Sequence, residues 1–240
     1  MYDISNFSLS DMTRCGAGLR KSGAEAASME EAATRIVHRL RSELLSSSGK
    51  PDCVLARTFI TVPYGRLPDD LKVFAARILP EIVDAPDVKC LTLLATAGDE
   101  PAWNDRHASQ GHQALPLPSA ASIARSPMIS QLIRQLGVEI GAFLTPSSEM
   151  MVDTAQHTFN VFHVADAIGS PHIPAQQQFV IPYGVQSVLG FGGLLPPGEL
   201  FATILFTRAR VTRDVAERFK TLALNVKVAL LPFAGVRTFT

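Results

Sequence analysis

The chain lacks an excess of charge of either sign. Its 240 residues carry 22 basic and 22 acidic side chains, so the formal net charge at pH 7 is zero. The basic residues are scattered and form no block of the kind that contacts phosphate backbones or anionic lipid. We therefore expect neither nucleic acid nor a membrane surface among the partners of this protein.

Cysteine is scarce. Cys15, Cys53 and Cys90 are an odd number, their spacing fits no metal-site motif, and no leader of charged then apolar residues precedes them. This pattern favours a reducing cytoplasm. Cys53 and Cys90 lie in two apolar segments that could meet across a sheet, but thiols in such segments are commonly inert small hydrophobes.

Long apolar runs are also missing. The longest, around residues 91–97 and 200–206, fall far short of the roughly 20 residues that cross a bilayer. The 47% share of apolar residues is nevertheless enough for a well-buried core. These features predict a soluble protein without a membrane span.

The chain does contain a regular order of predicted helices and strands. Ser28 and Glu31 have the spacing of a capping box, which predicts a helix over residues 28–45, after a first helix that follows Ser10. Strands are expected over residues 53–62 and 90–97, on either side of a helix over 70–79. A helix that begins at Ser126 and Pro127 and stops at Gly137 comes next, and then a strand over 159–164.

The last sixty residues have the clearest pattern. Residues 185–189 and 201–206 are rich in strand formers, and a Pro-Pro-Gly-Glu turn separates them, so we expect an antiparallel hairpin. Thr212 can cap a closing helix over residues 213–231, in which apolar residues recur at helical spacing.

This C-terminal order resembles the second half of a GAF domain. The segments 91–104 and 183–195 look like the GAF-type sensory regions found ahead of bacterial histidine kinases and related signalling proteins. The resemblance implies an α+β fold with a GAF-like, PAS-related antiparallel sheet, helices packed on one face and ligand-pocket loops on the other. It also implies one domain over residues 1–240, with enlarged connections at about 98–157 and terminal helices that serve as a dimer interface.

The unusual polar residues gather in the enlarged loops, where ligands are usually met. Trp103, the only tryptophan, can stack on a ring or close over a cavity, and Arg106 can bind an anion through its fork of donors. The alternatives are a tryptophan packed as a loop anchor and polar groups that cap loops or face water. The candidate ligand-binding residues are Trp103, Asn104, Arg106, His107, His112, His163 and Tyr183.

The histidines raise the question of a metal or haem. His107 and His112 are five residues apart, which fits no zinc motif, and no cysteine pair completes a site, so we expect no metal ion. Haem held by a single axial ligand stays an alternative because one ligand needs no motif. The cofactor is therefore unknown, and a small-molecule ligand is expected.

Three function classes fit the pattern. The leading interpretation is a sensory domain of bacterial signal transduction that couples small-molecule binding to a histidine kinase, another output partner or a downstream domain. A small enzyme on the same fold is an alternative, but the sequence contains no constellation of nucleophile and base. A ligand-free dimerisation or interaction module is the other alternative, and it predicts a pocket filled by side chains.

Overall fold

The computed structural model describes residues 1–240 except 47, 138–139, 141–143, 145–159, 174 and 197. Short 3-10 turns join some of the regular elements. The α-helices are α1 (Leu9–Ser22), α2 (Met29–Glu43), α3 (Asp69–Ile78), α4 (Ala120–Ala124), α5 (Pro127–Gln135) and α8 (Arg213–Leu230). The strands are β1 (Tyr2–Asp3), β2 (Leu44–Leu45), β3 (Cys53–Pro63), β4 (Lys89–Gly98), β5 (Ala114–Pro116), β6 (Val161–Val164), β7 (Ser187–Leu195) and β8 (Glu199–Thr207).

An antiparallel sheet of six strands organises the molecule. Its order is β5-β4-β3-β8-β7-β6, so β3 and β8 occupy the centre. The predicted hairpin is confirmed as β7 and β8, and its turn uses Gly198 at φ +108°. Gly192 permits close approach within the hairpin, because a Cβ there would lie 2.1 Å from the Phe201 carbonyl oxygen.

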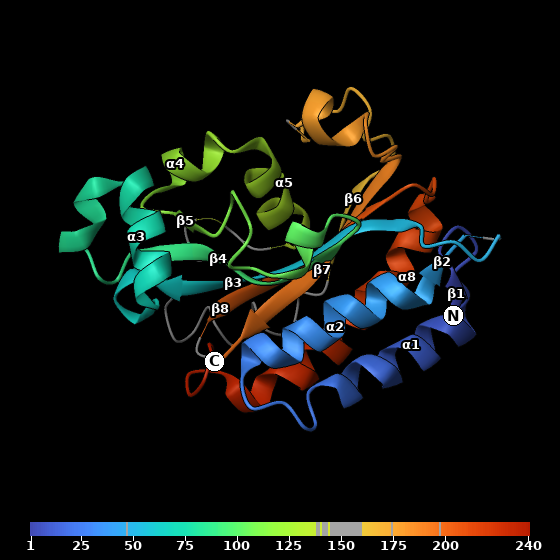
Figure 1. Ribbon diagram of the computed structural model, residues 1–240, viewed down its shortest axis with the longest axis horizontal. Coiled ribbons are helices and arrows are strands. Elements are labelled where there is room, and N and C mark those ends of the chain that lie inside the picture. The colour runs from blue at the N-terminus through green and yellow to red at the C-terminus, as the bar shows by residue number, and fades with distance from the viewer. Residues whose placement is uncertain (47, 138–139, 141–143, 145–159, 174, 197) are drawn as a thin grey trace.

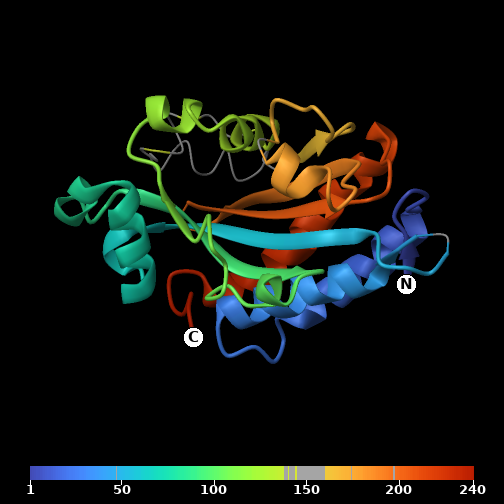
Figure 2. The same ribbon diagram turned by 45° about the horizontal axis from the view of Figure 1, so that its top comes forward.

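The two faces of this sheet are covered differently. Figures 1 and 2 show α1, α2 and α8 together on one face, and α4 and α5 on the other. On the helix face, α2 packs on β3 and β4, α8 packs on β7, and α1 lies against α8. One buried cluster lies between helices and sheet and includes Phe191 and Phe219, and a second lies on the opposite face and includes Phe59 and Phe162.

The helix starts follow the predicted signals with two corrections. Ser28 does cap α2, since its Oγ accepts from the Glu31 amide, but the Glu31 carboxylate accepts from the amide of Ala27 rather than of Ser28. The first helix starts earlier than the prediction from Ser10. It is capped by Ser8, whose partner Asp11 completes a reciprocal capping box.

The remaining boundaries lie within a few residues of the prediction where the chain is described. The ends of α5 and α8 agree with the expected stops, and Gly137 takes φ +79° just after α5. The predicted start of β6 at residue 159 and much of the connection over 138–157 lie outside the described residues. The sequence did not predict β5, α4 or a π-helical turn over Gln176–Val180.

The α+β class and the GAF-like arrangement are confirmed by these layers. The antiparallel six-stranded sheet has the terminal helices, α2 and α8, side by side on one face and loops with short helices on the other. Among the described residues, no helix combines the length and the apolar character that a membrane span requires.

Candidate functional site

A cavity of about 200 Å³ lies on the sheet face opposite the long helices. Its floor comes from β3, β4 and β8, and its walls come from α5, the loop over residues 101–117 and the π-helical turn. Most of its lining is aliphatic or aromatic. The lining residues are Leu55, Arg57, Phe59, Leu91, Trp103, His112, Leu115, Met128, Ile129, Leu132, Ile173, Ala175, Phe179, Ile204 and Phe206.

The alternation of β3 places a charged residue on this floor. Side chains two residues apart point to the same face of a strand, so Leu55, Arg57 and Phe59 share the cavity face. Leu55 and Phe59 are buried, whereas Arg57 keeps a little solvent contact. An arginine in the middle of a central strand between apolar neighbours is uncommon, since charged side chains are rarely buried without a partner.

Aromatic rings form one wall of the cavity. The Trp103 ring centroid lies 4.7 Å from that of Tyr183 and 5.5 Å from that of Phe179. Gly98, at the end of β4, makes room for the indole, since a Cβ there would lie 2.7 Å from Trp103 Cε3. The Tyr183 hydroxyl donates to Glu100 at 2.9 Å, and this hydrogen bond raises the pKa of Tyr183 and ties the two loops together.

The Arg57 guanidinium has few protein partners. Its Nη2 donates to the Ser109 hydroxyl at 3.4 Å, and its Nε is buried without a hydrogen-bond partner among the described residues. Burial lowers the pKa of Arg57 to about 10, so the group stays positively charged at neutral pH. The ring of His112 is partly shielded from water. Desolvation and the Arg57 charge lower the pKa of His112, so this ring is uncharged at neutral pH.

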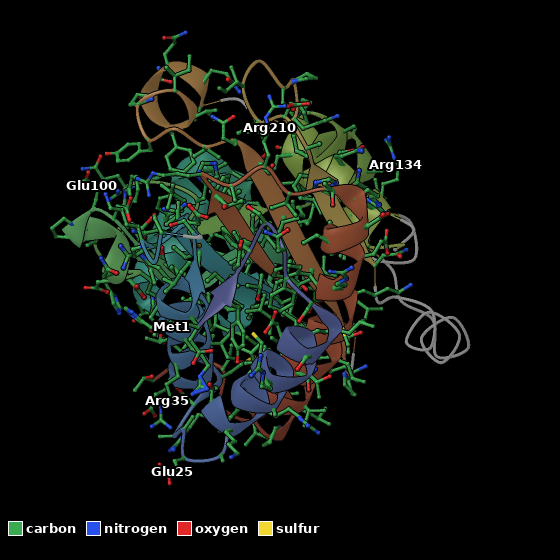
Figure 3. All side chains as sticks on the ribbon, turned by 90° about the vertical axis from the view of Figure 1, so that its right-hand side faces the viewer. Met1, Glu25, Arg35, Glu100, Arg134 and Arg210 are labelled. Carbon is green, nitrogen blue, oxygen red and sulfur yellow. The ribbon has the colours of Figure 1, made fainter. Side chains whose placement is uncertain are left out.

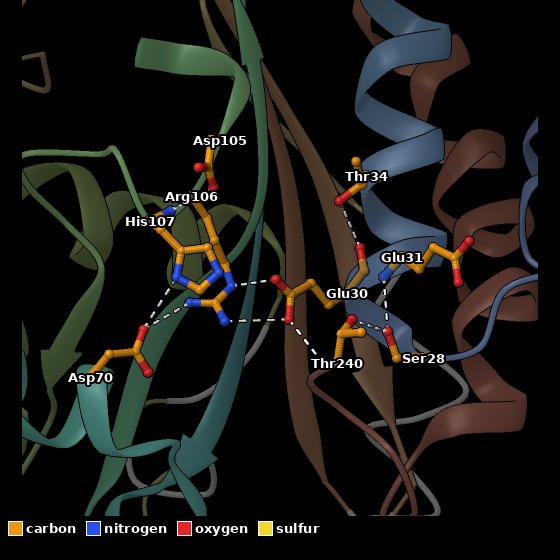
Figure 4. A network of polar contacts seen from close by, with 9 residues as sticks. All are labelled: Ser28, Glu30, Glu31, Thr34, Asp70, Asp105, Arg106, His107 and Thr240. Carbon is orange, nitrogen blue, oxygen red and sulfur yellow. Dashed lines mark hydrogen bonds and ion pairs between the residues drawn. The ribbon is translucent and has the colours of Figure 1, made fainter.

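Arg106 and His107 lie outside the lining of this cavity. Arg106 is buried, its Nε donates to Glu30 at 2.5 Å and its Nη1 donates to Asp70 at 3.2 Å (Figure 4). The exposed ring of His107 lies 3.6 Å from the same Asp70 carboxylate. Arg106 therefore joins α2 to α3, and its donors are used by the protein itself.

Asn104 and His163 are also absent from the lining. The Asn104 amide donates to the Gly98 and Glu100 carbonyl oxygens and accepts from the Gly98 amide, so it caps its own loop. His163 lies on β6, and its Nε2 is 2.9 Å from the Val211 carbonyl oxygen, ahead of α8. Of the candidates, Trp103 and His112 line the cavity, and Tyr183 contacts Trp103 from outside the lining. The other candidates lie elsewhere.

The sequence analysis missed Arg57. The signal was present in the predicted strand over residues 53–62, where Leu55, Arg57 and Phe59 are in phase. A charged residue on the apolar face of a strand is informative for the same reason that a buried polar group is.

Thiol and metal chemistry find little support in the described residues. Burial raises the pKa of Cys15, Cys53 and Cys90 to about 12, which suppresses the reactive thiolate. Cys53 and Cys90 do not meet across the sheet, because Cys90 pairs with Val62, nine residues or about 30 Å along β3 from Cys53. No group of three or more candidate metal ligands gathers in the described part of the chain.

No family model matches the chain, and no curated protein matches it in sequence. Among solved structures, it is similar to a free methionine-R-sulfoxide reductase from Neisseria meningitidis, with TM-score 0.49 and 8% identity over 92% of this chain and 89% of that one. A GAF domain of a phosphoenolpyruvate-protein phosphotransferase from Coxiella burnetii gives TM-score 0.46 and 13% identity over 93% of each chain.

A phycocyanobilin-bound GAF domain from a cyanobacterial phytochrome gives TM-score 0.42 and 12% identity over 93% of each chain. The substrate bound in the structure of the reductase and the bilin bound in that of the phytochrome domain are ligands of those proteins. The GAF-like fold of this chain rests on its own strand order and layers.

Proposed function

We propose that this chain is a ligand-binding sensory domain of bacterial signal transduction. The observation that carries the proposal is the apolar cavity on the loop-covered face of the sheet, with one largely shielded cation, Arg57, in its lining. Ligand pockets are typically concave, mostly apolar and furnished with a few convergent polar groups. In this proposal residues 1–240 act as one unit, and a small molecule occupies the cavity.

The cavity favours this proposal over a ligand-free interaction module, which would fill the same space with side chains. An enzyme on the same fold is less well supported. The cysteines are buried and hard to ionise. His112 in the lining could act as a base, but the described lining contains no serine, threonine, cysteine or carboxylate that it could activate or pair with.

The output of the domain is proposed to pass through the helix face. Leu224, Val228 and Leu231 form an exposed apolar stripe on and just beyond α8. A second copy of the chain packed on this stripe would make a homodimer whose geometry ligand binding could bias, toward a histidine kinase or another signalling partner. The three unpaired cysteines agree with a cytoplasmic location.

Native mass spectrometry and an absorption spectrum of protein freshly purified from a cellular host test the proposal. We expect an added mass that corresponds to a small molecule held in the cavity, and a haem would also give a Soret band. A bare polypeptide that also fails to bind any member of a broad metabolite panel would contradict the sensory function. Sedimentation of the Leu224→Lys variant tests the dimer separately, since a charge in the stripe should give a monomer.

A further inference from the structure

The chemistry of the cavity floor points to one class of ligand, and this inference rests on the sensory function proposed above. Arg57 reaches the floor from β3, one of the two central strands of the sheet. Its Nε is buried and has no acceptor among the described residues, and Ser109 is the acceptor of its Nη2. No described carboxylate forms an ion pair with it, in contrast to most other arginines that the structure describes.

A second buried polar atom lies beside it. Thr96 on β4 is the cross-strand partner of Arg57, so both side chains stand on the same face of the sheet, about 5 Å apart at Cβ. The Thr96 side chain is buried, and its Oγ1 also lacks a hydrogen-bond partner among the described residues. Thr96 does not line the cavity, so the polar side chain that the floor itself presents is Arg57.

An uncompensated charge at the position of Arg57 costs free energy unless a ligand supplies the opposite charge. A buried hydrogen-bonding group without a partner loses the free energy of its hydration, and a buried charge loses more. An anion in the cavity would compensate the Arg57 charge through charge-assisted hydrogen bonds with the guanidinium. Because His112 is neutral at pH 7, the described lining carries a single positive charge, which matches an anion with a single negative charge.

The apolar lining of the cavity indicates the size and polarity of the rest of the ligand, beyond its acidic group. Leu91, Ile129, Leu132 and Phe206 are among the apolar side chains around the floor, with the Trp103 ring at one side. A cavity of 150 Å³ lined by apolar groups holds a benzene molecule. The present volume of about 200 Å³ therefore has room for a ring or a branched chain together with a short acidic group.

We propose that the cavity binds a small monocarboxylate with an apolar ring or branched body, whose carboxylate is held by the guanidinium of Arg57. A phosphate ester would bring a second negative charge that no described side chain of the lining matches. A neutral molecule of the same shape would leave Arg57 uncompensated.

Phenylacetate is a suitable probe, with phenylacetamide as its neutral isostere and phenyl phosphate as the more highly charged alternative. Trp103 is the only tryptophan and lines the cavity, so its fluorescence reports binding directly. On the wild-type protein we expect saturable binding of phenylacetate, and binding of the amide and the phosphate weaker by about tenfold or more. This comparison uses the wild-type protein alone, so it does not depend on whether any variant folds.

Variants then assign the effect to Arg57. Arg57→Gln should remove the preference for acid over amide, and Arg57→Lys should keep part of it because the charge remains. Arg210→Gln is the matched control. Arg210 is highly exposed, pairs with Asp166 and lies outside the lining, so the same loss of charge there should leave both affinities unchanged (Figure 3).

The outcomes separate this inference from the function on which it rests. Equal affinity for acid and amide, or a preference that survives in Arg57→Gln, would overturn the monocarboxylate inference while the cavity still binds ligand. A neutral molecule or a phosphate ester found by native mass spectrometry would do the same and leave the sensory function standing. If none of the probes binds, the monocarboxylate inference fails. If, in addition, no molecule co-purifies and no member of the metabolite panel binds, the sensory function fails with it.

Discussion

The two faces of the sheet each contain an arginine that is largely shielded from water, and the two are satisfied in opposite ways. On the helix face, Arg106 donates to the carboxylates of Glu30 and Asp70 and lies 5.4 Å from the ring centroid of Phe239. On the cavity face, the described partner of Arg57 is one hydroxyl, at 3.4 Å. Both are charged groups largely shielded from water, but of the two only Arg106 has its charge compensated by carboxylates of the described residues.

The difference separates a residue that supports the fold from one that is available for binding. An arginine held by carboxylates already uses its N–H donors in those ion pairs, and it can bind a ligand only if the pairs break. An arginine with a buried, unused donor gains its partner when a ligand arrives. Residue type alone does not distinguish the two, because both have the chemistry that recognises an anion.

The largest effect is expected from removal of the compensated arginine. Arg106→Ala leaves the Glu30 carboxylate, only 13% exposed, without its ion-pair partner, and we expect the free energy of unfolding to fall by about 3 kcal/mol. Urea denaturation measures this loss. Arg210→Ala, in an exposed pair, should cost less than about 1 kcal/mol. Equal losses in the two variants would contradict the structural role of Arg106.

A change on the cavity face should act through packing. In Gly98→Ala the new Cβ would lie 2.7 Å from Trp103 Cε3 and 3.0 Å from Leu55 Cδ1, so the indole must move. We expect a loss of about 1–3 kcal/mol and a shift of the tryptophan emission. Gly111→Ala is the matched control, since no atom lies within 4 Å of its Cβ. An unchanged emission spectrum in Gly98→Ala would contradict the described position of the ring.

The stability of α1, on the helix face, should depend on pH through its N-terminal capping box. The hydrogen bond from the Ser8 hydroxyl holds the pKa of Asp11 below its usual range, so the capping box stabilises α1 when Asp11 is ionised. Asp11→Asn should lower the free energy of unfolding by about 1 kcal/mol at neutral pH. The folded pKa is lowered, so this stabilisation is present above the usual carboxyl pKa and disappears as pH falls through the folded value. Urea denaturation at several pH values measures it, and a difference that persists in strong acid would argue against the cap.

The smallest effect on stability is expected at Arg57. Arg57→Met removes a charge that the described residues do not compensate, so the free energy of unfolding should stay within about 1 kcal/mol of the wild-type value or rise. The same urea denaturation applies, with Arg106→Met as the comparison. A loss as large as that of Arg106→Met would place Arg57 among the structural arginines and remove the contrast between the two faces.

Much of the fold could be predicted because the sequence carries local signals for it. The β7–β8 hairpin follows from two runs of strand formers around a glycine turn, and α8 follows from Thr212 and an apolar stripe. The short β5 and α4 lack such signals, since three to five residues show no periodicity. The site was only partly predictable. Trp103 and Tyr183 are joined by contacts between distant loops, and the roles of Arg57 and Arg106 depend on which carboxylates the fold brings near each.

The turn over residues 105–109 has a consequence for how the two faces respond to one another. Arg106 at its start lies between α2 and α3, and Ser109 at its end contacts Arg57 at the cavity floor. The Ser109 amide donates to the Arg106 carbonyl oxygen, so the two anchor points belong to one hydrogen-bonded loop. The two faces of the sheet are therefore coupled through this turn. A displacement of the Ser109 hydroxyl would also move the residues that lie between α2 and α3.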